Sequence, residues 1–288
     1  MKHLLILIYI CLPLSIIAQT SQQYKIYDVK NQKVISVSEL IKDLNRTDVL
    51  FFGEEHNDSI GHVLELEIFK QLHTAYPKTA LSMEMFHTDV QPVINEYLGG
   101  YISEKNFIKE ARAWNNYKDY QPLIEYAKAN KIDVIGANGA ARYSNMVSKS
   151  GLDILNTLPK ESKSYLPRLP IDTATGSYYD KFIKELGGHN MGSMKIYQTQ
   201  NFWDATMAWS IARYLKKHKG TKVLQLNGRF HSDEKLGTLA KLKSTSKKLI
   251  ISNLSCFPSA DYSNPDWEKH KSLGDYIIIT DPGVKKSF

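Results

Sequence analysis

Two Gly-x-x-His turns, each directly after an apolar run typical of a buried strand, constrain the fold of this chain more than any other feature. The first turn, 53–56, follows the run 48–52, and the second, 228–231, follows the run 222–227. Most of the chain separates the two turns, so they lie side by side only if their strands belong to one sheet. In an open α/β sheet, ligands bind in the crevice at the carboxyl ends of the strands. Glycine allows a sharp bend there, and the turns therefore predict a site at that edge.

Four side chains at these strand ends are candidate metal ligands. His56 and His231 close the two turns, Glu54 lies inside the first turn, and Glu84 follows the next apolar run, 79–83. Histidine and carboxylate groups bind divalent metals and carry protons. We expect the four side chains to converge on one polar site. The alternative is that the histidines only hydrogen-bond to loop backbone.

The alternation of strand-like runs with amphipathic segments predicts an α/β fold, with a mostly parallel sheet flanked by helices. Strands are expected at 24–29, 33–37, 48–53, 79–84, 133–137, 222–227, 249–254 and 276–280. Helices are expected at 38–44, 59–75, through most of 86–130, and at 139–158, 198–217 and 233–242. Pro122 is expected in the first turn of a helix that ends near Asn130.

The segment 159–192 is rich in glycine and proline and has no clear periodicity. Such segments are typical of surface loops. We therefore expect a helical insertion, roughly 139–200, within a single α/β domain that spans 19–288. This lobe carries five tyrosines: Tyr143, Tyr165, Tyr178, Tyr179 and Tyr197.

The first eighteen residues are typical of a secretory signal peptide. Lys2 provides a short positive region, an apolar run follows from Leu4 to Ile17, and Ala18 is a small residue at its end. Cys11 lies inside the apolar run rather than after small residues at its end, so the sequence favours cleavage after Ala18 over lipidation. We expect an exported protein, in the periplasm or associated with the outer membrane.

Charge and cysteine content exclude some classes of protein. The formal net charge is +7, but the lysines are scattered over expected helix faces and ends, and no nucleic-acid-binding motif is present. We therefore expect no nucleic-acid partner. Cleavage after Ala18 would leave Cys256 alone, so the fold does not depend on an internal disulfide bond.

The motifs together resemble the ChaN-like haem-binding uptake proteins of the Tiki/erythromycin-esterase superfamily. The resemblance rests on 52–57 with His62, on 83–86, on Trp114, Tyr117 and Tyr120, on 134–138, and on 227–231. It implies haem as the ligand, a homodimer, an outer-membrane haem receptor as partner, and frequent membrane anchoring. It also implies a crevice shared with metal-dependent hydrolases. The lack of a lipidation motif departs from lipid-anchored relatives.

Haem needs an apolar slot, an axial donor to iron, and cations for its propionates. A phenolate suits ferric iron, and Tyr143 follows an expected strand end, so we expect Tyr143 as the axial ligand, with Tyr178 or Tyr179 next. His87 and Arg142 are candidate propionate partners. The leading function is haem binding in iron uptake, without turnover.

The alternative function is a metal-dependent hydrolase of an ester or amide. His56 and His231 would hold the metal, and Glu54 or Glu84 would act as general base. A third histidine ligand is missing from this hypothesis, because His62 is expected on a helix that points away from the first turn.

Overall fold

Apolar strands that are buried on both sides form the centre of the molecule. The computed structural model describes residues 23–187 and 193–288, so the predicted signal peptide and Cys11 lie outside the described residues. The strands are β1 (Tyr24–Asp28), β2 (Lys33–Ile35), β3 (Val49–Glu54), β4 (Thr79–His87), β5 (Val134–Asn138), β6 (Lys222–Gly228), β7 (Ile251–Pro258) and β8 (Tyr276–Thr280). They form one sheet in the order β2-β1-β8-β7-β3-β6-β4-β5.

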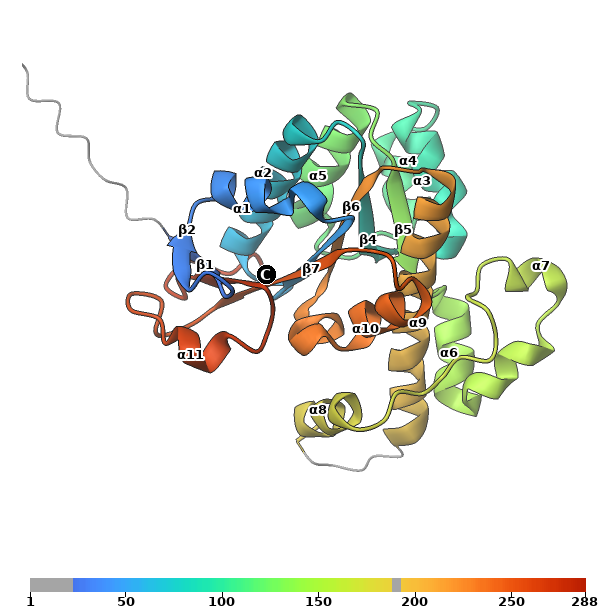
Figure 1. Ribbon diagram of the computed structural model, residues 1–288. Helices are drawn as coiled ribbons and strands as arrows, with labels where there is room; N and C mark the ends of the chain where they lie inside the picture. The colour runs from blue at the N-terminus through green and yellow to red at the C-terminus, as the bar shows by residue number, and fades with distance from the viewer. Residues whose placement is uncertain (1–22, 188–192) are drawn as a thin grey trace, which may run out of the picture.

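The sheet is mostly parallel, as predicted. Strands β3 to β8 pair in parallel, whereas β1 joins β8, and β2 joins β1, in antiparallel pairs. Helices cover both faces, as expected for a parallel sheet (Figure 1). The α/β fold class is therefore confirmed.

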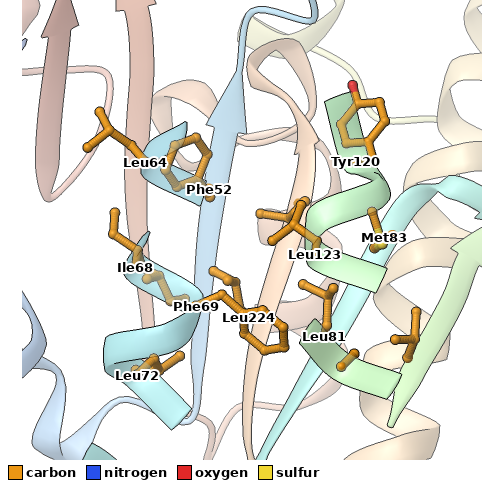
Figure 2. Packing of buried hydrophobic residues seen from close by; sticks show 14 of the residues in the cluster. Phe52, Leu64, Ile68, Phe69, Leu72, Leu81, Met83, Tyr120, Leu123 and Leu224 are labelled. Carbon is orange, nitrogen blue, oxygen red and sulfur yellow. The ribbon is translucent and has the colours of Figure 1, made fainter. Parts of the chain in front are cut away.

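Alternating side chains of the strands supply two separate cores. Leu50 and Phe52 of β3 pack with the helices of one face, and Val49 and Phe51 pack on the other. The first face is covered by α1 (Val37–Asp43), α2 (Ser59–Ala75), α3 (Gln91–Leu98), α4 (Glu104–Glu110) and α5 (Tyr117–Ala129). Figure 2 shows side chains of β3, β4 and β6 in this core with Leu64, Ile68 and Phe69 of α2.

The second face is covered by α9 (Ser193–Lys217) and α10 (Gly237–Thr245), whose residues Ile211 and Leu239 pack on Val49 and Phe51. The remaining helices are α6 (Ala141–Ser150), α7 (Lys160–Lys163), α8 (Ser177–Glu185) and α11 (Trp267–His270). Figure 1 shows α6 and α8 next to α9 and away from the sheet, with α7 on the outer side of α6. Two small apolar clusters join α6 and α8 to α9.

Four expected helices differ in the structure. The helix through 86–130 is divided into α3, α4 and α5, because β4 continues to His87 and short breaks follow α3 and α4. Pro122 lies inside α5 rather than in a first turn, since α5 already begins at Tyr117. The helix expected at 139–158 ends at Gly151, which has a φ of 86°, and continues as a 3₁₀ segment.

The helix expected at 233–242 begins only at Gly237. Glu234 and Lys235 have φ angles of 61° and 59°, which lie in the left-handed region that a continuous α-helix excludes. Among the described residues, no helix combines the length and the apolar character needed to cross a membrane.

The exposed edge of β5 is covered by one side chain. Gln91 Nε2 donates to the Val134 carbonyl at 2.8 Å, and the Gly136 N–H donates to Gln91 Oε1 at 2.8 Å. Gln91 thus replaces a neighbouring strand at that point and blocks edge-to-edge pairing.

We predict that Gln91→Ala lowers the free energy of unfolding by about 1–3 kcal/mol, because it leaves two backbone groups without partners. Urea denaturation followed by circular dichroism measures the change. Asn95→Ala is the matched control, since the Asn95 side chain accepts a hydrogen bond from Gln91 Nε2 and contacts no backbone group of β5 in the described residues, and it should change stability by less than about 0.5 kcal/mol. Equal losses in the two variants would contradict the role of the backbone bonds.

Candidate functional site

The two Gly-x-x-His turns lie side by side at the carboxyl edge of the sheet. β3 and β6 are neighbours, and their register pairs Glu54 with Gly228. The turns approach so closely that a Cβ atom on Gly228 would lie 2.9 Å from His56 Nε2, and one on Gly53 would lie 2.9 Å from the Arg229 Cα. Both positions therefore favour glycine because neighbouring atoms occupy the space of a Cβ atom, and not only because the chain bends there.

His56 lies at the mouth of the crevice. Its Nδ1 atom is 2.8 Å from Glu54 Oε1, and its ring meets Trp114 edge-on at 5.2 Å between centroids. Burial opposes charge on His56, but the Glu54 and Glu84 carboxylates outweigh it and raise the pKa of the imidazole. The side chain is still 39% exposed, so His56 is the ionisable group of this network that solvent reaches most easily.

His231 lies deeper and is held between two carboxylates. Its Nδ1 is 2.7 Å from Asp204 Oδ1 and its Nε2 is 3.4 Å from Glu84 Oε1. Burial disfavours the charge, but Glu84 and Asp204 raise the pKa of His231 to about 10. Both ring nitrogens of His231 are thus engaged by carboxylates, an arrangement that does not support the metal-dependent hydrolase hypothesis.

Glu84 and Asp204 are held in place by further hydrogen bonds. Glu84 Oε2 accepts the Gly228 N–H at 2.8 Å. Asp204, which lies on α9, accepts hydrogen bonds from Tyr178 at 2.6 Å and Thr238 at 2.8 Å. This network joins β4, β6, α8, α9 and α10. Asp204 was not predicted, because its only sequence signal is an acidic residue inside an otherwise buried helix face.

His62 points toward the crevice, and the expectation that it points away was wrong. Asp58 caps α2, so His62 lies in its first turn, and side chains in a first turn lean toward the helix N-terminus. His62 Nδ1 lies 3.4 Å from Glu54 Oε2 and 3.3 Å from Glu65 Oε2. Tyr120 donates to Glu54 Oε1 at 2.8 Å. Glu65 was also missed, although a glutamate three positions after a histidine is a recognisable signal.

An open pocket of about 660 Å³ lies in front of the network. Its lining is strongly charged and includes Glu54, Glu55, Asp180, Lys181, Lys184, Arg229 and Asp233. Arg229 bridges Asp233 at 2.7 Å and Glu55 at 3.3 Å. Acidic side chains outnumber basic ones in the lining, which mixes polar with apolar surface.

Comparison with known proteins identifies the family. The sequence model of the family described as "Haem-binding uptake, Tiki superfamily, ChaN" matches residues 40–242. The chain belongs to this family. No curated protein matches the chain.

Among solved structures, the chain resembles the ChaN of Campylobacter jejuni, whose structure describes cofacial haem binding. The TM-score is 0.69 at 19% identity, and the match covers 91% of this chain and 98% of that one. A type III effector, HopBA1, matches with a TM-score of 0.47 at 13% identity, over 85% of this chain and 93% of that one. A toxin effector domain from Vibrio vulnificus matches at 0.46 and 14% identity, over 88% and 39% of the two chains.

The residues predicted to hold haem in this ChaN-family chain fall into two groups. Tyr178 belongs to the crevice network, where burial and Asp204 raise its pKa well above the usual value. Tyr179 packs edge-on against Tyr197, with centroids 5.0 Å apart. Tyr143 and Arg142 lie on α6, and His87 ends β4. Tyr143 and Tyr178 thus pack in separate apolar clusters of the lobe.

Tyr143 is buried in the lobe cluster and receives a hydrogen bond from Arg142 at 3.0 Å. Arg142 also pairs with Asp89, as does Arg112. Burial lowers the pKa of His87. Arg142 also lies over the Tyr165 ring, 5.7 Å from its centroid.

A groove of about 540 Å³ begins next to Tyr165 and runs along the free edge of the sheet between α3 and α9. Apolar and aromatic side chains line much of it: Pro92, Val134, Ile135, Tyr165, Trp209 and Tyr214. We call it the edge groove. Arg213, Lys217 and His218 lie along it on α9, so cationic and imidazole groups border an apolar surface. Sequence reasoning did not find this groove.

The raised pKa of His231 gives a pH test of the crevice. A histidine whose folded pKa of about 10 exceeds its usual 6.5 stabilises the fold fully below pH 6.5, and the stabilisation is lost as pH rises toward 10. Urea denaturation should show the free energy of unfolding of the wild type falling between pH 7 and pH 10, by up to about 1.4 kcal/mol per pH unit.

Asp204→Asn removes one of the two charges that raise this pKa, so its stability should fall less steeply over the same range. His218→Gln, which changes an exposed histidine of α9, is the control and should follow the wild-type slope. Parallel slopes for wild type and Asp204→Asn would contradict a charged His231.

Proposed function

We propose that the protein is an exported haem-binding protein of haem and iron uptake, and that it carries haem without chemical turnover. Membership of the haem-binding uptake family supports haem as the ligand. The observation that carries the proposal within this chain is the edge groove, because it combines an apolar wall with cations at the scale of ligand pockets, about 300–1,000 Å³.

Haem fits the chemistry of the edge groove better than that of the charged pocket in front of the crevice. The porphyrin face needs apolar and aromatic contacts, which Trp209, Tyr214 and Pro92 offer. Its propionates need cations at the rim, and Arg213 stacks 5.0 Å above the Trp209 ring with its guanidinium exposed to solvent. Lys217 lies one helical turn further along α9.

Tyr165 is the best-placed candidate for the iron ligand. Its side chain is half-buried and lines the groove, whereas Tyr143 is only 3% exposed. Tyr143 lies behind the Arg142 guanidinium, which is 4.4 Å from its ring centroid. Iron would reach Tyr143 only if Arg142 left its pair with Asp89. We therefore place Tyr165 before Tyr143 as the axial ligand.

The state of His231 supports the proposal that the crevice does not turn over a substrate. A hydrolase needs a histidine with a free nitrogen or a metal with an open position. The two nitrogens of His231 face Asp204 and Glu84, whereas His56 is bonded to Glu54 through Nδ1. We infer that the network mainly holds β3, β4 and β6 together.

A second copy of the chain would complete a cofacial arrangement. The edge groove is open, with Pro92, Asn95 and Arg213 exposed, so a haem in it would keep one face accessible. Two copies meeting at this edge would stack the exposed faces of two haems. An outer-membrane haem receptor, the other proposed partner, would take haem from the same open side.

The first test is titration with ferric haem, followed by absorption spectroscopy. Wild type should bind one haem per chain and show the charge-transfer band of a tyrosine-ligated ferric haem. Tyr165→Phe keeps the ring but removes the phenol oxygen, so the band should vanish and affinity should fall by about tenfold or more, equivalent to 1.4 kcal/mol.

Tyr143→Phe is the matched control and should keep the wild-type spectrum. His56→Ala combined with His231→Ala should also keep it, because the crevice is a separate region. If Tyr143→Phe alone removed the band, haem would bind inside the lobe rather than the edge groove. If micromolar haem did not bind at all, the proposed function would be wrong.

Export has its own test. The expected mature N-terminus is Gln19, because the small residue Ala18 ends the apolar run. Intact-mass measurement of the protein from the cell envelope should give the mass of residues 19–288. A lipid-modified mass that retains Cys11 at the N-terminus would contradict this cleavage and would show membrane anchoring.

A further inference from the structure

A second group of ionisable side chains lies behind the crevice, where β3 meets the first turns of α2. Glu54, His62 and Glu65 each offer one ligand atom, and these atoms all lie within 4.8 Å of one another. The exposed fractions of the three residues are 2%, 7% and 0%. His62 and Glu65 make no contribution to the Glu84–His231–Asp204 network, so this cluster needs an explanation of its own.

The hydrogen bonding of His62 orients its free nitrogen toward the two carboxylates. His62 Nε2 lies 3.0 Å from the His56 carbonyl oxygen and must donate its proton there, because a carbonyl only accepts. In neutral imidazole the other nitrogen, Nδ1, then carries a lone pair. That nitrogen faces Glu54 Oε2 and Glu65 Oε2, and metal-binding histidines commonly donate their other N–H to a backbone carbonyl in this way.

The carboxylates have oxygens without partners. Across residues 23–187 and 193–288, Glu54 Oε2 and Glu65 Oε1 are buried and accept no hydrogen bond. Burying two carboxylates beside a lone pair is costly unless a positive charge compensates them. Glu54 pairs with His56 through its other oxygen, so one divalent cation would compensate Glu65 and supply a partner for the unpaired oxygens.

We propose that Glu54, His62 and Glu65 form a binding site for one divalent cation of the zinc type, separate from haem. Zn–N and Zn–O bonds of about 2.0–2.1 Å place neighbouring ligand atoms of a tetrahedron about 3.3–3.4 Å apart. The two separations from His62 Nδ1 are 3.4 Å and 3.3 Å. The cation would link β3 to α2 and so stabilise the crevice from behind.

Tyr120 and the charged pocket both fit a cation site at this cluster. Tyr120 donates to Glu54 Oε1 and leaves Glu54 Oε2 for the cation, which is the arrangement of an outer hydrogen bond that orients a ligand. The charged pocket provides an entry path, since Glu54 and His56 line it and His56 is partly exposed.

The test is calorimetric titration of the metal-free, full chain with ZnCl₂ after dialysis against a chelator. Wild type should bind one Zn²⁺ per chain with micromolar or tighter affinity, and Zn²⁺ should raise its melting temperature. Glu65→Gln, which keeps shape but removes the anionic ligand, should weaken binding by about 100-fold or more. Tyr120→Phe should weaken it by about 10–100-fold, as for other outer-shell partners.

Glu84→Gln is the matched control, because Glu84 is an equally buried carboxylate that belongs to the His56–His231 set. It should bind Zn²⁺ within about threefold of wild type, a difference below 1 kcal/mol. Circular dichroism of each variant confirms folding, and titration with CoCl₂ gives a second readout, since tetrahedral Co²⁺ should produce visible absorption in wild type and lose it in Glu65→Gln.

Three outcomes would overturn the proposal. If the wild type bound no Zn²⁺ at micromolar concentration, protons alone would compensate the negative charge of the cluster. Wild-type affinity in Glu65→Gln would exclude Glu65 as a ligand. Loss of binding in Glu84→Gln but not in Glu65→Gln would assign the metal to the histidines of the two turns. None of these results depends on haem.

Discussion

The parallel pairing of β3 with β6 is the constraint on which the rest of the structure depends. Its register sets Glu54 beside Gly228, and the side chains of both turns then have fixed neighbours. Gly228 must lack a Cβ because His56 occupies that space. Its N–H in turn holds Glu84, and Glu84 helps to keep His231 charged. A shift of one residue in this pairing would move every one of these groups to the wrong face of the sheet.

The molecule separates a polar region from an apolar one. At the carboxyl edge of the sheet, buried charges are paired closely and connect strands to helices on both faces. At the free side edge, α3, α9 and the lobe leave an open groove with aromatic walls. We propose that haem binds at this free edge, and that the crevice, which the superfamily resemblance links to hydrolysis, has a structural role.

The sequence predicted those parts of the fold that local pattern determines. β8 was placed correctly because its run is almost wholly apolar and buried, and β6 was placed to within one residue. The two turns were placed together because parallel strands share an edge. Local pattern could not show that Pro122 lies inside α5, or that Glu234 breaks the helix before Gly237. His62 was oriented wrongly although the start of α2 was placed correctly, because local pattern does not show how the first turn of α2 packs against the end of β3. The edge groove was missed because Tyr165 and Trp209 come from distant segments with no shared motif.

Hydrogen exchange measured by mass spectrometry, with and without ferric haem, tests the central claim most directly. Haem in the edge groove should slow exchange in 88–95, 133–136 and 209–218, since ligand binding suppresses local opening of the segments it contacts. Exchange in the two Gly-x-x-His turns should stay unchanged. Protection confined to 53–62 and 228–234, with an unaffected edge groove, would contradict the account and return the haem site to the crevice.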